Sequence, residues 1–451
     1  MNRTILAGRP DERPKVTSNW ALRTFGPPPG LKEMNVVCWG LFVAFLLVPL
    51  IVLLWLQLIA GPKSLLKLHP DFIYFYGVGR IVNDYSISRL YDYSLQLDVF
   101  NQLNTLKEGS YGPSPYPPYV AAFFSLFARL PFDIAFILWA AISLALYLFG
   151  IACVVRELFR GERLKVSLIF CFCLAFYPFI ISTLVNGQLS SVAFAAIGLA
   201  ILCEKRSRPF CCGLALSVLG YKPTLLLLIV PMLLLTKRFR SLTGLIVGGI
   251  GWVSLATAIA GIQFWPVYIR FLRSFGAVAG VGQRSTLQSW KYVDVHSSLN
   301  SLGGSQSSLG VGILSVFTIV IATSLGILLW KSHSAVRSAQ DLAWAATLTW
   351  TLLLNIYVPI YDSVLVAIAI ILTLSSPEAL KGMVPIGRWV PLAILVIALS
   401  WITVAVARKY GVQPLTLFLG VLGLGQLYLL QKTCSSPQSQ GASKLMPIAE
   451  S

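Results

Sequence analysis

FDIAFILWAAISLALYLFGIACVV, residues Phe132–Val155, contains a single charged side chain, Asp133, in 24 residues. An α-helix needs about 20 apolar residues to cross the hydrocarbon core of a bilayer. Backbone groups cannot stay unpaired in lipid, and the stretch lacks the alternating pattern of a transmembrane β-strand. It therefore predicts a transmembrane helix.

Apolar runs of similar character recur along the chain. Apolar residues make up 56% of the 451 positions, charged residues make up 12%, and the mean hydropathy is +0.76. Soluble domains carry about 25% charged residues. We therefore expect an all-α, polytopic transmembrane helical bundle of about 12 membrane segments. The other segments are expected at about Asn35–Ala60, Val166–Leu184, Leu189–Cys203, Pro209–Gly220, Thr224–Leu235, Ser241–Ile262, Ser308–Trp330, Gln340–Tyr357, Ser363–Leu374, Trp389–Ala407 and Val412–Leu430.

The two ends of the chain are polar. Residues 1–34 are Pro-rich and basic, too long and too polar for the first part of a signal peptide, and no small-residue cleavage site follows the apolar run. We expect a disordered cytoplasmic tail at 1–34, a transmembrane domain at 35–431 and a second disordered cytoplasmic tail at 432–451.

The basic residues indicate an orientation. The net charge is +18, but the basic residues lie in short loops between apolar segments and form no stripe on a soluble face, which disfavours nucleic-acid binding. With the N-terminus inside, the segments predicted to be cytoplasmic hold 22 of the 35 Lys and Arg residues. Both termini are then inside, and the long outer loops are 61–118 and 263–307.

Some segments are too short to cross alone. Pro209–Gly220 and Thr224–Leu235 suggest a re-entrant hairpin broken at Lys222-Pro223, which requires protein or water around the break. Tyr119–Leu130 suggests a half-helix or an interfacial helix. The first outer loop, rich in Tyr and Asp, suggests one or two interfacial helices.

Cysteine and histidine usage points to neither disulfides nor metal. None of the eight cysteines falls in a predicted outer loop, and the three histidines are isolated. We expect no disulfide framework, no metal site and no cofactor.

Polar residues inside or beside the apolar runs fall on one side of the predicted bilayer. Ionisable groups at membrane depth are costly and are functional candidates by default. Their shared side predicts a site at the outer interface instead of a channel through the middle. They are Asp71, Tyr116, Asn186, Gln188, Lys222, His296, Asn300, Tyr361 and Asp362.

Each candidate has a structural alternative. Asp71, among aromatic residues, suits a general base with a raised pKa, and it equally suits an N-cap for a helix that begins at Phe72. Lys222 suits pairing with an anionic phosphate, the alternative being a side chain that reaches the interface. Arg270 and Arg273 suit interfacial anchoring or phosphate binding.

The other candidates are weaker by themselves. Asn186-Gly187-Gln188 is also typical of a plain turn between helices. Asp362 also suits the cap of a short helix, and His296 lies in a basic loop.

Together these motifs resemble glycosyltransferase family 87. The resemblance covers about Asp71 to Leu374, and the order and spacing of the motifs carry it. The segment His296–Asn300 matches the family's Asn-Gln-Ser pattern only loosely. The motifs are Asp71-Phe72, Phe75-Tyr76, Gly79, Leu90-Tyr91-Asp92, Tyr116-Pro117-Pro118, Leu130-Pro131, Trp139, Asn186-Gly187-Gln188, Arg208-Pro209, Lys222-Pro223, Lys237-Arg238, Asn300 and Tyr361-Asp362.

The resemblance implies a GT-C membrane fold and a mannosyltransferase that uses a polyprenyl-phosphate donor at the outer face of the inner or plasma membrane. It implies that Asp71 is the catalytic base, that Lys222, with His296, Arg270 or Arg273, neutralises the donor phosphate, and that transfer inverts the anomeric centre. The implied partners are a glycolipid or glycan acceptor and membrane lipids. The other expected substrate contacts are Tyr76, Tyr116, Asn186, Gln188, Asn300, Tyr361 and Asp362.

The main alternative is a secondary transporter, and a lipid-handling membrane protein without transferase activity is a weaker one. A helix broken at Lys222-Pro223 suits a transporter, but transporters usually show internal repeats and a site at the bilayer midplane. No internal repeat is evident in this sequence.

Overall fold

The computed structural model describes residues 71–103, 112–159, 163–277, 289–301, 308–333, 337–356, 358–376 and 389–435. These residues form helices and contain no strand; the one bridge among them joins Tyr292 and Pro359. The all-α prediction is confirmed for this part of the chain. The first expected crossing, Asn35–Ala60, and most of both predicted tails lie outside the described residues.

Four described helices are long and apolar enough, by length and composition, to cross a membrane. They are α6 (Phe132–Leu158), α11 (Phe239–Ala260), α14 (Ser308–Ser332) and α19 (Pro414–Cys434). Apolar side chains on their surfaces, such as Ile137, Ile250 and Ile319, are 60% or more exposed, as expected of side chains that face lipid. The molecule is a membrane protein, but the expected count of about 12 crossings is not confirmed.

A single helix was expected at Val166–Leu184, and the structure breaks it. Helix α7 (Arg163–Leu174) is followed by η4 (Pro178–Val185), a short helix with wider π-type turns, and then by α8 (Ser190–Lys205). Pro178 has no backbone N–H and cannot continue the hydrogen-bond ladder of α7.

The predicted break at Lys222-Pro223 is present. Helix α9 (Pro209–Ser217) tightens into η5 (Val218–Tyr221), and after Lys222 the chain returns through η6 (Pro223–Leu226) and α10 (Ile229–Leu235). Lys222 therefore occupies the turn between two short helical arms.

A third pair of helices has the same form. Helix α15 (Arg337–Leu354) leads through a turn that includes Asn355 into η10 (Ile360–Leu365), and α16 (Val366–Leu374) follows. Helix α18 (Trp389–Tyr410) then precedes α19.

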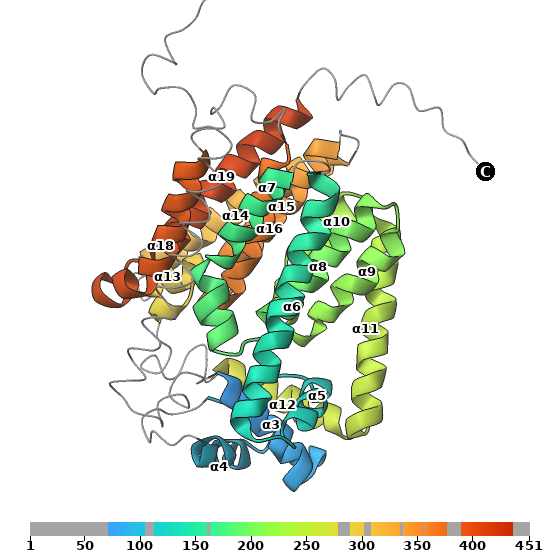
Figure 1. Cartoon of the computed structure of the whole chain (residues 1–451). Helices are drawn as coiled ribbons and strands as arrows, with labels where there is room; N and C mark the ends of the chain where they lie inside the picture. The colour runs from blue at the N-terminus through green and yellow to red at the C-terminus, as the bar shows by residue number, and fades with distance from the viewer. Residues whose placement is uncertain are drawn as a thin grey trace, which may run out of the picture.

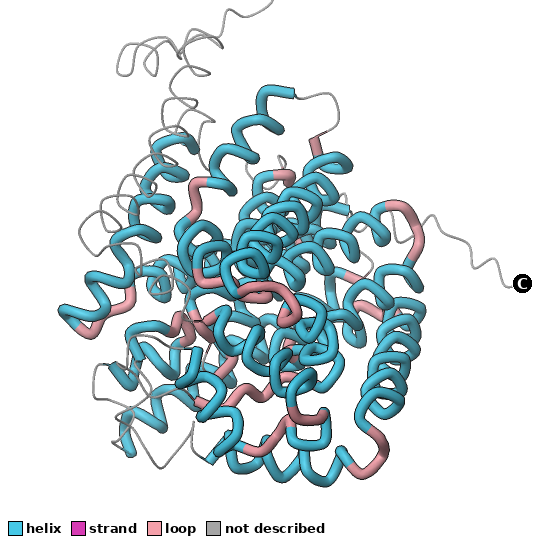
Figure 2. The backbone as a smooth tube through the Cα atoms, turned by 60° about the horizontal axis from the view of Figure 1, so that its bottom comes forward, coloured by secondary structure: helices cyan, strands magenta, loops and turns pink. Residues whose placement is uncertain are grey.

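Helices of the two predicted outer loops lie across one end of the bundle, at the bottom of Figure 1: α3 (Phe72–Asp84), α4 (Tyr93–Leu103) and α12 (Phe264–Ala277). The short helix expected at Tyr119–Leu130 is α5 (Pro118–Phe127), which lies in the same end layer. Figure 2 brings this end forward and shows short loops joining the helices. One or two interfacial helices were expected in the first loop, and α3 and α4 are short helices there; their position at a membrane interface stays a prediction. The smaller elements are η3 (Ile87–Arg89), η8 (Ser289–Lys291) and α13 (Val295–Ser301).

Aromatic side chains join this end layer to the bundle. The ring of Phe72 lies 5.4 Å from that of Phe132, and the ring of Phe124 lies 5.0 Å from that of Trp139. Gly79 brings the backbones of α3 and α5 close, because a Cβ there would lie 2.4 Å from the Phe124 carbonyl oxygen. Helices α3 and α5 are therefore packed on each other and on α6.

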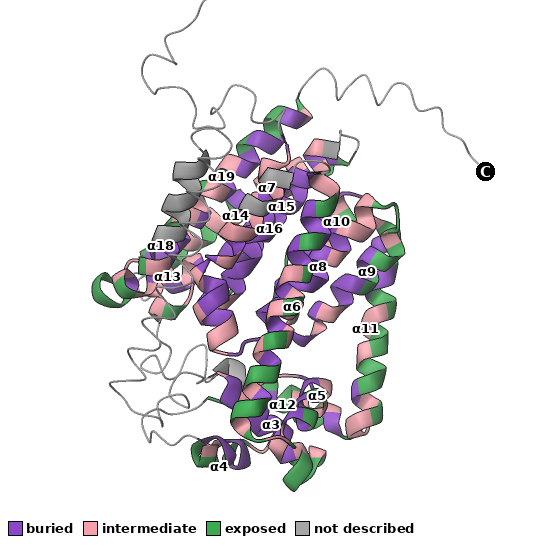
Figure 3. Cartoon of the chain, viewed as in Figure 1, coloured by how far each residue is buried: buried purple, intermediate pink, exposed green. Residues whose placement is uncertain are grey.

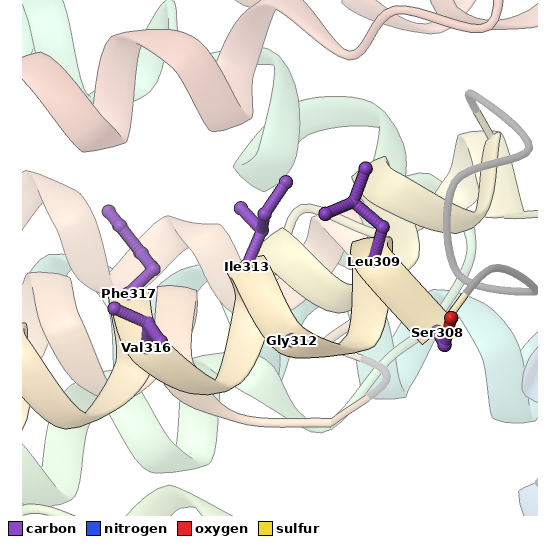
Figure 4. Close-up of a pocket in the computed structure, with 6 residues that line it drawn as sticks. All are labelled: Ser308, Leu309, Gly312, Ile313, Val316 and Phe317. Atoms are coloured by element: carbon purple, nitrogen blue, oxygen red, sulfur yellow. The ribbon is translucent and has the colours of Figure 1, made fainter.

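Burial differs sharply between helices. Figure 3 shows α8 and α16 largely buried and α11 largely exposed along its outer face. An open apolar hollow of about 690 Å³ lies on α14, lined by Ser308, Leu309, Gly312, Ile313, Val316 and Phe317 (Figure 4). The polar candidate residues take no part in its lining.

Candidate functional site

Three of the turns between helical arms meet at one place. Ser190 Oγ, at the start of α8, donates a 2.9 Å hydrogen bond to Asp362 Oδ1 in η10. Asn355 Nδ2, in the turn after α15, donates to the Thr224 carbonyl at 2.8 Å. These bonds tie the turn after η4 to η10, and the turn after α15 to the Lys222 break.

The Lys222 ammonium forms an ion pair with the Asp362 carboxylate. It also lies 4.9 Å from the centroid of the Tyr361 ring. Asp362 is 1% exposed, so its charge would be costly without this partner. Pro359 occupies the N-cap position of η10, and the Asp362 side chain faces Lys222 and Ser190, so the capping alternative for Asp362 is wrong.

Asp71 stands at the N-cap position of α3, but its side chain makes no capping hydrogen bond. The Gln188 side chain hydrogen-bonds to its carboxyl group instead. Burial raises the pKa of Asp71, and the Gln188 bond and the charge of Lys291 oppose this rise. The carboxyl group is therefore held by a residue of a distant turn, in a setting that favours proton uptake.

Asn186-Gly187-Gln188 forms a turn, and this turn also positions the Gln188 side chain next to Asp71. Gly187 has φ +72°, and Trp139 Nε1 donates a 2.9 Å hydrogen bond to its carbonyl. A Cβ at Gly187 would lie 2.7 Å from the Cβ of Phe72, the residue after Asp71. The motif is therefore both a turn between helices and a part of the candidate site.

Tyrosines connect the two carboxylates. The rings of Tyr116 and Tyr221 lie 6.4 Å apart, and the Tyr221 hydroxyl donates to the Leu189 carbonyl at 3.1 Å. Burial raises the pKa of Tyr116, and the charges of Asp362 and Asp71 raise it further. Tyr116 therefore senses both carboxyl groups, and it links Asp71 with its partner Gln188 to Asp362 with its partner Lys222, which also lies beside Tyr361. We call these six residues the polar cluster.

Other candidates have structural contacts away from this cluster. The Tyr76 hydroxyl donates to the Leu130 carbonyl at 2.8 Å, and Asn186 ends η4 in a half-buried position. Arg270 and Arg273 are exposed on α12, and Arg270 Nε donates to the Pro266 carbonyl at 3.3 Å. These contacts suit packing and an interfacial helix.

His296 and Asn300 face each other on α13, with 3.3 Å between His296 Nδ1 and Asn300 Nδ2. The buried Asp294 precedes this helix and accepts hydrogen bonds from the backbone N–H groups of Ser297, at 2.7 Å, and Val358, at 2.8 Å. Burial raises the pKa of Asp294, and these bonds oppose the rise. Asp294 thereby anchors the second outer loop beside η10.

Sequence reasoning missed Ser190, Tyr221 and Lys291 as members of the site. Ser190 and Tyr221 lie within two residues of Gln188 and Lys222, so the neighbourhood of those motifs was the available signal. Lys291 lies in the predicted outer loop 263–307, and its effect on Asp71 depends on the folded chain. In the described part of the chain, no three His, Cys, Asp or Glu residues gather as a metal would require.

Comparison with known proteins agrees with the resemblance drawn from the motifs. The model of glycosyltransferase family 87 matches residues 115–359, which is more than half of the 451-residue chain. The matched region includes Tyr116, Gln188 and Lys222. A search of curated proteins and a search of solved structures found no match. Because this match covers more than half of the chain, the chain belongs to glycosyltransferase family 87.

Proposed function

We propose that this glycosyltransferase moves a hexose, mannose by the family resemblance, from a polyprenyl-phosphate donor to a glycolipid or glycan acceptor. The reaction takes place at the outer face of the inner or plasma membrane and inverts the anomeric centre. The observation that carries this proposal is the polar cluster, in which the Asp71 carboxyl group and the Asp362 carboxylate both act on Tyr116 and Asp362 is paired with the Lys222 ammonium.

Asp71 is the general base. It takes the proton of an acceptor hydroxyl while that oxygen attacks the anomeric carbon of the donor. The bond between this carbon and the phosphate oxygen breaks, and the polyprenyl phosphate leaves as a stabilised anion. Because such a leaving group needs little protonation, one carboxylate is enough, unlike the two used by most glycoside hydrolases.

Lys222 is the group for the donor phosphate. An ammonium has three N–H donors, and the pair with Asp362 uses only part of this capacity. Charge-assisted hydrogen bonds to phosphate are stronger than neutral ones and stabilise the charge that develops on the leaving group. Asp362 and Ser190 keep the ammonium in place before the donor arrives.

The distribution of charge supports an outer site. Arg238 precedes α11 and pairs with Glu204 near the end of α8, and Arg206 pairs with Glu157 near the end of α6. The start of α11 and the end of α6 lie opposite α3 and α12 in Figure 1, and basic residues at this end indicate the cytoplasm. A site at the α3 end then faces away from cytoplasmic nucleotides, which suits a lipid-linked donor.

A donor comparison tests the proposal. Purified protein in proteoliposomes with a membrane lipid extract is given radiolabelled polyprenyl-phosphate mannose or a radiolabelled nucleotide sugar. We expect transfer from the polyprenyl donor alone, and an α-linked product from a β-linked donor by nuclear magnetic resonance. Transfer from the nucleotide sugar, or retention at the anomeric carbon, would overturn it.

A further inference from the structure

Gln188 has a buried oxygen that nothing in the described chain uses. Its side chain hydrogen-bonds to Asp71, the residue is 5% exposed, and its Oε1 has no hydrogen-bond partner. When Asp71 is ionised, as a general base must be, its carboxylate only accepts hydrogen bonds, so the Nε2 group of Gln188 faces Asp71 and Oε1 is the atom without a partner.

Buried acceptors without a partner are rare, because the group loses water and gains nothing in return. A second glutamine shows the same feature away from the site. Gln426 on α19 donates to Thr373 Oγ1 at 3.0 Å, and its Oε1 also lacks a partner. The two glutamines differ in what their Nε2 groups contact. Gln426 contacts a threonine hydroxyl, whereas Gln188 contacts the proposed general base, next to which the substrate hydroxyl must bind.

We propose that Gln188 Oε1 accepts a hydrogen bond from a second hydroxyl of the acceptor, adjacent to the hydroxyl that Asp71 deprotonates. This rests on the proposed function and narrows it. The acceptor presents two neighbouring ring hydroxyls, so it is a sugar of a glycolipid or glycan. A serine or threonine side chain, with one hydroxyl, fills only half of this site.

The geometry follows from a single amide group. The Gln188 nitrogen and oxygen are bonded to the same carbon, so a hydroxyl at Oε1 lies beside one held by the carboxyl group that Nε2 contacts. Neighbouring hydroxyls of a pyranose project side by side in the same way. Gln188 is thus a specificity-determining residue for the acceptor and a positioning residue for Asp71.

Octyl α-mannopyranoside and its four single-deoxy derivatives are suitable acceptor probes, with polyprenyl-phosphate mannose as donor. In the wild-type protein we expect one deoxy probe to be inactive, because it lacks the attacking hydroxyl. A probe that lacks a neighbouring hydroxyl should lose roughly 10–100-fold in kcat/KM.

Gln188→Met removes both polar atoms at similar size. Loss of support for Asp71 lowers the rate with every acceptor, but the preference for the neighbouring hydroxyl should shrink to within about 3-fold. Gln426→Met, the matched control, should keep the full preference. The proposal fails if wild-type protein ignores the neighbouring hydroxyl, as it would if Oε1 held only water, or if Gln188→Met keeps the preference.

Binding separates this inference from the proposed function. If no probe is glycosylated, tryptophan fluorescence titrations without donor compare the same five glycosides. Tighter binding of the parent glycoside, lost in Gln188→Met and kept in Gln426→Met, would support the diol site although the transfer chemistry had failed. Equal or absent binding of all five would overturn it.

Discussion

The pKa of the Asp71 carboxyl group sets how the protein should respond to pH. Burial raises this pKa above 3.8, and the Gln188 hydrogen bond opposes the rise. A general base must be ionised to act, so activity should fall as the pH decreases through the raised pKa. In a plot of activity against pH, the decrease on the acidic side should therefore lie at a higher pH than an ordinary aspartate would give.

Gln188→Leu should move that decrease further toward neutral pH, because it removes a hydrogen bond that favours the ionised carboxylate. The measurement is kcat/KM against pH for the wild-type and variant proteins. A decrease that stays in place or moves to lower pH would show that Gln188 does not act on the base.

The same burial means that an ionised Asp71 lowers the stability of the folded protein. A carboxyl group with a raised folded-state pKa binds its proton more tightly in the folded protein, so stability decreases as pH rises through that pKa. At neutral pH, Asp71→Asn should raise the melting temperature while it removes activity, as happens where function demands a destabilised group. A lower melting temperature in detergent would contradict this account of the site.

Lys222 and Asp362 should behave as a unit. Lys222→Met leaves a carboxylate that is 1% exposed without its ammonium, at a cost of about 3–5 kcal/mol. The double variant Lys222→Met/Asp362→Asn should recover most of this stability and still lack activity, because the donor phosphate has no cation. Thermal unfolding measures the stability of the two variants, and transfer assays measure their activity. Recovery of activity in the double variant would exclude a phosphate role for Lys222.

Sequence reasoning found the polar residues but could not pair them. Asp71, Gln188, Lys222 and Asp362 are conspicuous in an apolar chain, and their predicted side followed from the loop charges. The Lys222–Asp362 pair joins residues 140 positions apart, which no local pattern encodes. N-capping suited both Asp71 and Asp362, and long-range partners decided against it.

At the scale of elements, the turn after η4 aligns the base. Gly187→Ala places a side chain at φ +72° and 2.7 Å from the Phe72 Cβ, so it should cost about 1–3 kcal/mol and displace Asp71. Gly249→Ala on α11 is the control, since its Cβ meets nothing within 4 Å, and it should be neutral or slightly stabilising. Equal melting temperatures and equal transfer rates for the two variants would refute this role.

Helix length explains which elements the sequence could predict. Long apolar runs such as Phe132–Leu158 were expected nearly as found, because length and composition suffice for them. The break at Pro178 and the irregular turns of η5, η6 and η10 were harder to place, because protein packing around them satisfies their backbone groups. Residues of the candidate site lie in these irregular elements or in the turns next to them.

At the scale of the whole molecule, the two ends of the bundle are held by different interactions. At the end opposite α3, Glu204 pairs with Arg238 at 2.6 Å and accepts a hydrogen bond from Trp344 Nε1 at 2.8 Å. At the α3 end, the ring contacts of Phe72 and Phe124 dominate. Ion pairs and hydrogen bonds therefore hold the helices together at the end opposite α3. At the α3 end, the turns between these helices lie next to the layer that contains Asp71.

The central claim is that Asp71 deprotonates an acceptor hydroxyl for transfer from a polyprenyl-phosphate sugar. The most direct test compares Asp71→Asn with Asp84→Asn, which alters an exposed aspartate paired with Arg80 on the same helix. Both variants are reconstituted in proteoliposomes with radiolabelled polyprenyl-phosphate mannose and a membrane lipid extract. Asp71→Asn should reduce the transfer rate by about 10²–10⁴-fold while Asp84→Asn retains it; full transfer by folded Asp71→Asn protein would contradict the claim.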